Sequence, residues 1–379
     1  MKRKIINFIL FLMMTALLIV LIFIGCLIYL NIVSDDSKQV VYNLQDIAVE
    51  EPTEEKEKKE NTQDTKNIGD AIQSIFNSNS NTNDNTYTPN ENISQSYFYN
   101  QLNESEKIIY NGLQSNKDNL KQGTYVINFG NQFTDILSDE GGGDLLGNYY
   151  QTAIEAFTHD NPDLFYLDVN KMYLNIETTT KILKTTYNVY ISPSKSQTYL
   201  LDEFSDSDQI KEIELAIEKV KNEVLSNLKG NDYQNILYIH DYLVDSIEYD
   251  STYNATGSYG LYGALITKKC VCEGYAKAFK FLANAAGYEC EIMQGKATNS
   301  SGNTENHAWN CVNINGTWYL VDTTWDDPII VGKGKITKKI RYKYFLKGTD
   351  TFNKDHTLSY KFSEEGKEFS YPTISREDY

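Results

Sequence analysis

The amino-acid sequence predicts an α+β fold, and three observations support that prediction. Apolar residues follow Cys272 at helical spacing as far as Gly287, which is typical of a helix that ends at glycine. The pair Asn315-Gly316 separates two runs of alternating side chains, a strong signal for a two-residue β-hairpin. All three tryptophans of the chain, together with His307 and Cys311, lie in or beside that hairpin. Such a density of rare residues indicates a site.

The N-terminus has the pattern of a membrane anchor. Lys2-Arg3-Lys4 precedes an apolar run over residues 5–33. The run exceeds both the roughly 20 residues that a helix needs to cross a bilayer and the apolar region of a cleaved signal peptide. We therefore expect a cytoplasmic N-terminus (1–4), one transmembrane helix (5–33) and an extracellular remainder at the cell membrane. A lipid on Cys26 is the alternative, although apolar residues continue after it.

Residues 34–95 have the composition of a disordered linker. A charge-dense tract over 50–60 is followed by a tract over 77–92 that is rich in Asn, Ser and Thr. Neither tract offers enough apolar area to offset the entropy cost of ordering it. The formal net charge of the chain is −17, which excludes nucleic acid as an expected partner because phosphate binding requires clustered Lys and Arg.

Two folded regions are expected after the linker. The first, 96–204, has α+β character, because strand-like alternation over 171–192 follows helix-like segments. Nothing in it points to chemistry. The second, 205–379, begins with an amphipathic helix over 206–228 and contains the predicted hairpin.

Three of the four histidines are expected to have no catalytic role. His159 stands in a polar segment before a turn and is expected to be a loop or cap residue. His240 shares an apolar helical stripe, so we expect a buried structural residue. His356 is expected at the surface of the C-terminal tail.

Cys272 begins a predicted helix over 272–286. In the first turn, unpaired backbone N–H groups and the positive end of the helix dipole stabilise a thiolate relative to a thiol. A lone cysteine is more often a small buried hydrophobic residue than a nucleophile. Which of the two roles Cys272 has depends on the side chains that face its thiol.

The hairpin register identifies the partners. If Asn315-Gly316 is the two-residue loop, Trp309 faces Asp322 across the hairpin. His307 then points to the same face as Trp309 and is a diagonal neighbour of Asp322, roughly 7–8 Å away at the backbone. That distance is within reach of an imidazole and a carboxylate.

Cys272, His307 and Asp322 are therefore the predicted catalytic residues. In such a triad the histidine pairs with the thiolate and later protonates the leaving amine, while the aspartate orients the imidazole. The backbone N–H of Cys272 is a natural donor to the oxyanion. This chemistry requires no cofactor.

Several blocks of the sequence resemble the core of the transglutaminase-like (transglutaminase/protease-like) superfamily. They are V-C-E-G-Y-A, H-A-W-N and W-Y-L-V-D-T-T-W-D-D-P, preceded by I-H-D-Y-L-V-D-S-I-E-Y-D and L-Y-G-A-L-I. The resemblance implies a papain-like α+β fold, with the cysteine helix packed on an antiparallel sheet that carries the histidine and aspartate. It places the family's Cys–His–Asp triad on Cys272, His307 and Asp322, and it implies acyl transfer at an amide.

The remaining cysteines offer alternatives. A zinc site could be assembled from four cysteines and a histidine: Cys270, Cys272, Cys290, Cys311 and His307. Their spacing is not the paired spacing typical of structural zinc sites, so no metal is expected. Cys270 and Cys290 could instead form a disulfide, and the sequence does not decide between these alternatives.

The leading interpretation is a bacterial, membrane-anchored, extracytoplasmic cysteine enzyme. It would act on amide bonds of proteins or peptides, including cell-envelope ones, by hydrolysis or by transfer to an amine. The alternative is a non-catalytic binding or cell-envelope scaffold module that retains the transglutaminase-like fold.

Overall fold

The computed structural model of the chain describes residues 20, 24, 36–42, 97–181, 184–194, 197–327, 337–364 and 366–379. No helix within these ranges is long and apolar enough to span a membrane. The predicted transmembrane helix (5–33) lies outside the described residues apart from two isolated positions. Within the predicted linker (34–95), residues 36–42 form a strand, which corrects the expectation of disorder at that point.

Contacts group the described residues into two compact units that alternate along the chain. The first contains residues 36–42, 126–147 and 173–192. The second contains residues 97–125, 148–172 and the chain from 193 to the C-terminus. The boundaries of these units differ from the expected division of the chain at residue 204. The division into a region over 96–204 and a catalytic domain over 205–379 stays a prediction.

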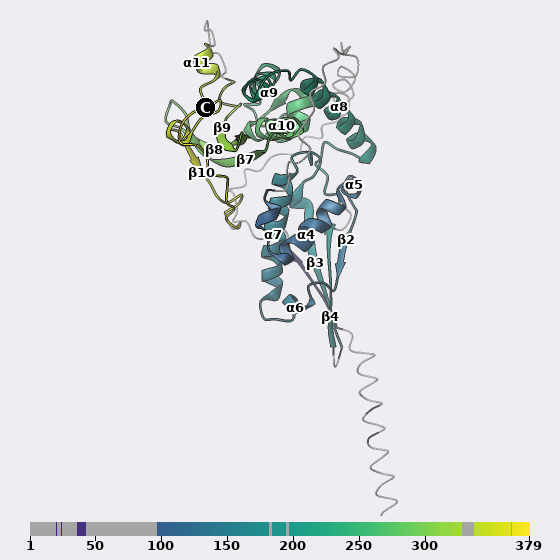
Figure 1. Cartoon of the computed structure of the whole chain (residues 1–379). Helices are drawn as coiled ribbons and strands as arrows, with labels where there is room; N and C mark the ends of the chain where they lie inside the picture. Colours follow the sequence, from purple (N-terminus) through teal and green to yellow (C-terminus); the bar gives the residue numbers. More distant parts are fainter. Residues whose placement is uncertain are drawn as a thin grey trace, which may run out of the picture. The chain divides into compact units, whose positions relative to one another are not determined.

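The first unit is built on a four-stranded sheet with the order β1-β3-β4-β2 (Figure 1). Its strands are β1 (Asp36–Tyr42), β2 (Ile127–Gly130), β3 (Met172–Lys181) and β4 (Lys184–Pro193). β1 pairs antiparallel with β3, and β2 pairs antiparallel with β4. A short helix, α6 (Thr134–Leu137), follows β2. The alternation over 171–192 therefore predicted β3 and β4 correctly.

The second unit contains most of the helices and a separate sheet. Its elements before the cysteine helix are η1 (Tyr99–Gln101), α4 (Glu104–Ser115), α5 (Lys117–Leu120), α7 (Gly142–Asp160, shared with the first unit), η2 (Val169–Lys171), α8 (Ser207–Ser226), α9 (Asp232–Ser246), β5 (Glu248–Tyr249), the π-helix η3 (Tyr262–Thr267) and β6 (Lys269–Cys270). The elements from there on are α10 (Cys272–Ala285), β7 (Cys290–Thr298), β8 (Thr304–Ile314), β9 (Thr317–Val321), α11 (Lys338–Arg341), α12 (Thr349–Phe352) and β10 (His356–Leu358).

Side-chain caps define where α8 and α9 begin. The carboxylate of Asp206 accepts hydrogen bonds from the backbone N–H groups of Asp208 (3.0 Å) and Gln209 (2.9 Å). Asn231 and Gln234 form a capping box at the start of α9. These contacts satisfy N–H groups that the first turn of a helix leaves unpaired. The apolar stripe of α8 is buried, as its spacing predicted.

The sheet of the second unit has the order β10-β7-β8-β9, and all its pairs are antiparallel (Figure 1). Ile314 pairs with Thr317, which confirms the predicted hairpin register. Asn315 and Gly316 form the turn with φ of 54° and 83°. Two consecutive positive φ angles suit the twist of a two-residue hairpin, and Asn-Gly tolerates them best.

The cysteine helix α10 packs on this sheet. Ala276 of α10 contacts Ile292 of β7 and Ala308 of β8, and Cys272 lies against the same cluster. These are small or apolar side chains, so the first two turns of the helix approach the sheet closely. The second unit thus brings the start of α10 beside the strands that carry the predicted histidine and aspartate.

Candidate active site

Cys272 is the first residue of α10, as predicted. Val271 caps the helix with extended backbone, and its N–H donates to the carbonyl oxygen of Ser258 at 3.1 Å. Gly274 permits this close approach, because a Cβ there would lie 2.8 Å from the same oxygen. The thiol of Cys272 is free and partly exposed. It therefore combines access from solvent with a position where helix N–H groups favour negative charge.

A buried aspartate, which the sequence did not single out, organises the loop before α10. The Asp250 carboxylate accepts hydrogen bonds from the backbone N–H of Thr252 (3.2 Å) and Ala255 (2.8 Å) and from the hydroxyls of Thr252 (2.6 Å) and Ser258 (3.0 Å). Its backbone N–H donates to Cys270 at 3.0 Å. Asp250 therefore fixes the loop against the residues that precede Cys272. Its place at the end of the I-H-D-Y-L-V-D-S-I-E-Y-D block was the available signal.

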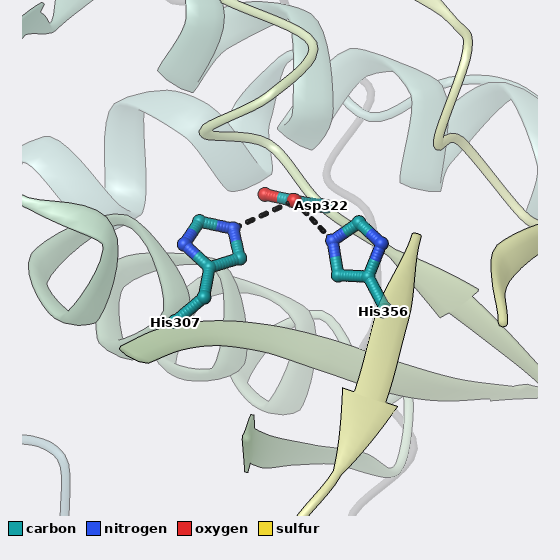
Figure 2. A group of neighbouring side chains, drawn as sticks. All are labelled: His307, Asp322 and His356. Atoms are coloured by element: carbon teal, nitrogen blue, oxygen red, sulfur yellow. Dashed lines mark hydrogen bonds and ion pairs between the residues drawn. The ribbon is translucent and has the colours of Figure 1, made fainter. Parts of the chain in front are cut away.

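His307 lies on β8 between two polar partners. Its Nε2 is 2.8 Å from Oδ2 of Asp322, a contact that the hairpin register predicted (Figure 2). The side chain of Cys272 is close enough to the imidazole to raise its pKa. Because Nε2 faces Asp322, Nδ1 is the nitrogen left for the thiol. Burial opposes the charged imidazole, but the charge of Asp322, the hydrogen bond to it and the nearby side chain of Cys272 outweigh burial and raise the pKa of His307 to about 10.

Asp322 directly follows β9 and is completely buried. Its Oδ1 accepts the backbone N–H groups of Thr324 (3.0 Å) and Trp325 (3.1 Å). Its Oδ2 faces the imidazoles of His307 and His356 (Figure 2). Burial favours the neutral carboxyl, but the charge of His307 and the hydrogen bonds from both imidazoles hold the pKa of Asp322 well below its usual range.

The expectation that His356 lies at the surface is wrong. His356 begins β10 and is 2% exposed. Its Nε2 lies 3.1 Å from Oδ2 of Asp322, and its Nδ1 lies 2.9 Å from Oδ1 of Asp355. It is buried because β10 pairs with β7, which places His356 opposite Ala297. Its sequence neighbourhood has no strong strand pattern, so only the tertiary pairing reveals the contact.

The other two histidines lie apart from this cluster. His240 is completely buried, as predicted, with Nδ1 3.1 Å from Asp241 and Nε2 3.2 Å from Asp326. His159 lies in the last turn of α7 rather than in a loop, with its Nδ1 2.9 Å from the carbonyl oxygen of Glu155.

Aromatic rings enclose the two imidazoles bound to Asp322. The ring centroid of Trp325 is 5.2 Å from that of His307 and 4.6 Å from that of His356. Phe352 and Tyr344 lie 4.1 Å and 5.1 Å from His356 by the same measure. Such a shell keeps water away from the carboxylate, and a low local dielectric strengthens its hydrogen bonds and ion pairs.

The other three described cysteines lack the features of a nucleophile. Cys270, Cys290 and Cys311 are buried free thiols, so the alternative disulfide is not formed. Burial raises the pKa of each thiol. Cys272 is the described cysteine that combines exposure with an imidazole partner.

His307, Asp322 and His356 each offer one atom that could ligate a metal, and these atoms lie within 4.8 Å of one another. The same atoms are already joined by hydrogen bonds, because Oδ2 of Asp322 faces both imidazoles. A metal ion would have to replace both bonds. Hydrogen bonding accounts for the short separations, and the absence of a metal remains a prediction.

Comparison with known proteins assigns the central part of the chain. Residues 219–323 match the family model of the transglutaminase-like superfamily. The kyphoscoliosis peptidase of Mus musculus is 30% identical over 149 residues, which cover 36% of this chain and 22% of that protein. The kyphoscoliosis peptidase of Homo sapiens is 35% identical over 103 residues, covering 24% of this chain and 15% of that protein. The chain therefore spans less than a quarter of the length of these relatives.

Among solved structures, the crystal structure of a TGase is similar over 45% of this chain and 48% of that chain, with 13% identity and a TM-score of 0.28. The family match spans α9, the cysteine helix and the hairpin as far as Asp322. The chain has a mixed α/β fold, and its residues 219–323 are accordingly a transglutaminase-like domain.

Proposed function

We propose that the chain is a cysteine acyl-transfer enzyme that acts on amide bonds of proteins or peptides. The observation that carries the proposal is the hydrogen bond between His307 and the carboxylate of Asp322, with Cys272 at the start of α10 close enough to His307 to raise its pKa. The raised pKa of His307 favours an imidazolium at neutral pH, and a thiolate at Cys272 is its natural counter-ion. Asp322 orients the ring so that Nδ1 faces the thiol.

In the first half-reaction the Cys272 thiolate attacks the amide carbonyl carbon and forms a C–S bond. The carbonyl oxygen becomes an oxyanion, for which the Cys272 backbone N–H is a suitable donor. Collapse of this intermediate breaks the C–N bond, and His307 gives its proton to the leaving amine. The product is a thioester on Cys272.

In the second half-reaction a water molecule or an amine attacks the thioester. The attacking group gives a proton to His307, and the Cys272 thiolate leaves. Hydrolysis and amine transfer thus share every residue and differ in the acceptor. The name of the mouse and human relatives, kyphoscoliosis peptidase, favours hydrolysis of peptide bonds.

The proposal includes a location at a bacterial cell membrane. Residues 5–33 would anchor the chain, with residues 1–4 in the cytoplasm and the transglutaminase-like domain extracellular, where cell-envelope proteins or peptides are the accessible substrates. The support is the apolar run after Lys2-Arg3-Lys4. Protease added to intact cells should remove the domain; full protection of the domain would reject this location.

Thiol reactivity tests the enzyme before a substrate is known. The full-length chain is treated with limiting iodoacetamide at about pH 6, where an ordinary thiol with a pKa of about 8.5 is almost unreactive. Mass spectrometry should find fast labelling of Cys272 that is lost in His307→Ala. The buried thiols of Cys270, Cys290 and Cys311 serve as internal controls. Slow labelling, or equal labelling of all four, would favour the non-catalytic scaffold.

A second assay separates the two acyl acceptors. A glutamine-containing peptide is incubated with a labelled amine, and both the labelled product and the free acid are measured. Cys272→Ala should abolish both products. Turnover that persists in this variant would contradict the assignment of the nucleophile.

A further inference from the structure

We propose that His356 is a positioning residue for the proposed acyl transfer, acting on His307 through the carboxylate that the two histidines share. This inference rests on the proposed function. His356 stands 34 residues after Asp322 and enters the site on β10. It lies outside the residues 219–323 that match the family model.

The first argument comes from the acceptor capacity of Asp322. Its Oδ1 is held by the backbone N–H groups of Thr324 and Trp325, and its Oδ2 by His307 at 2.8 Å and His356 at 3.1 Å. Four donors in fixed directions occupy the carboxylate and prevent it from rotating. Without His356, Oδ2 would be held by His307 alone, the group that Asp322 has to orient.

The second argument concerns how His356 is itself held. Its Nδ1 faces Oδ1 of Asp355 at 2.9 Å, while Oδ2 of Asp355 accepts the hydroxyl of Tyr344 at 2.7 Å. A carboxylate only accepts hydrogen bonds, so the contact with Asp322 forms when Nε2 of His356 carries a proton. His356 therefore faces Asp322 as a donor in this arrangement and does not compete as an acceptor.

The third argument is that packing leaves His356 little freedom. Its ring lies among those of Phe352, Trp325 and Tyr344, and it is 2% exposed. Figure 2 shows the two imidazoles on opposite sides of Asp322, each joined to the same carboxylate. The carboxylate is thus held between the rings of His307 and His356.

His240 provides a matched control within the same chain. It is also completely buried, and its two nitrogens also face two carboxylates, those of Asp241 and Asp326. It makes no hydrogen bond to Asp322. Replacing either histidine by the same residue therefore removes a buried imidazole and its two contacts with carboxylates. Only the replacement of His356 affects Asp322, the carboxylate that contacts His307.

The test measures the rate of Cys272 alkylation by iodoacetamide at about pH 6 in the full-length chain, with thermal unfolding as a check of folding. His356→Phe keeps an aromatic ring among the neighbouring rings but removes the donor, and we expect about tenfold slower labelling, the size that loss of a hydrogen bond to a charged group can cause. His356→Gln keeps an N–H donor and should label within about threefold of wild type. His240→Phe should stay within about twofold.

A double-mutant comparison distinguishes positioning from general destabilisation. Because His356 acts through His307, His356→Phe should cause no further slowing in a His307→Ala background. Equal slowing in both backgrounds, or no slowing in either, would overturn the positioning role. If the Phe variant does not fold, His356→Leu, which also removes the donor, carries the same comparison, with slowing only when His307 is present.

The proposed function can fail separately. If His307→Ala slows Cys272 and His356→Phe does not, the triad stands and the positioning role falls. If His307→Ala itself leaves Cys272 labelling unchanged, both the proposed function and the role of His356 are rejected.

Discussion

Asn310 of β8 donates a hydrogen bond from Nδ2 to the carbonyl oxygen of Ala276 in α10, at 2.9 Å. Asn310 is completely buried. The bond joins the helix that begins at Cys272 to the strand that carries His307. A direct polar contact thus holds together two elements whose relative position decides whether the thiol meets the imidazole.

Replacing Asn310 by Ala should lower the free energy of unfolding by about 1–3 kcal/mol, because the lost bond is buried. It should also slow alkylation of Cys272, since α10 and β8 lose their polar tie. Asn313→Ala is the control: Asn313 lies on the same strand, but its amide donates to Glu289 instead of α10. Equal slowing in both variants would contradict a specific role for the Asn310 bond.

The buried ion pair between Lys280 of α10 and Glu291 of β7 should dominate the stability of the helix–sheet contact. Lys280→Met should cost about 3–5 kcal/mol, because an unpaired carboxylate would remain in the core. Joint replacement by Lys280→Met and Glu291→Leu should restore much of the loss. Urea unfolding of the single and double variants measures both values.

The half-buried pair of Lys277 and Glu273, on the same helix, is the reference for that experiment. Lys277→Met should cost less than about 1 kcal/mol, because solvent screens the pair and hydrates the remaining charge. A similar loss of unfolding free energy in Lys280→Met and Lys277→Met would show that the buried pair stabilises the fold no more than the pair of Lys277 and Glu273.

Stability should depend on pH through His307. Its pKa is about 10 in the folded chain, compared with about 6.5 for an ordinary histidine. A raised folded-state pKa contributes stability that is fully present below about pH 6.5 and is lost as pH rises through about 10. The free energy of unfolding should therefore fall over this interval, and by less in His307→Gln. Parallel curves for wild type and variant would refute this coupling.

Gly295 should be required for the approach of β10 to β7. It pairs with His307 on β8 and with Leu358 on β10. A Cβ at Gly295 would lie 2.1 Å from the carbonyl oxygen of Thr357, so Gly295→Ala must displace the backbone of β10. We expect a loss of about 1–3 kcal/mol, typical of overpacking, together with slower Cys272 labelling.

Gly260→Ala is the control for Gly295→Ala. An added Cβ at Gly260 would have Phe165 as its nearest neighbour, at the ordinary contact distance of 3.4 Å. This variant should keep the thermal stability of the wild type. A Gly295→Ala variant as stable and as reactive as Gly260→Ala would mean that β10 tolerates the shift.

Local patterns were sufficient for the hairpin and for the start of α10. An Asn-Gly turn sets the register of the two strands that it joins. Because side chains alternate between the two faces of a strand, His307 then points to the face of the hairpin that carries Asp322. The spacing after Cys272 located the helix to within one residue of its observed end at Ala285. Both signals act over a few residues, where backbone geometry and side-chain pattern are directly coupled.

Long-range pairings escaped the same analysis. β10 is three residues long and has a weak alternation, so its position beside β7 depends on contacts with residues far earlier in the chain. The same reason applies to β1, which pairs with β3 across more than a hundred residues. Asp250 was missed because the sequence block that ends at it does not reveal its partners, which are backbone N–H and hydroxyl groups.

Short-range periodicity and turn chemistry were enough to predict the helix of Cys272 and the register that brings His307 toward Asp322, and the resemblance of sequence blocks indicated the transglutaminase-like superfamily. The packed structure was needed to show that His356 shares the carboxylate of Asp322 and that Asp250 fixes the loop before Cys272. Burial and hydrogen-bond satisfaction govern those contacts, and both depend on which distant segments pack together.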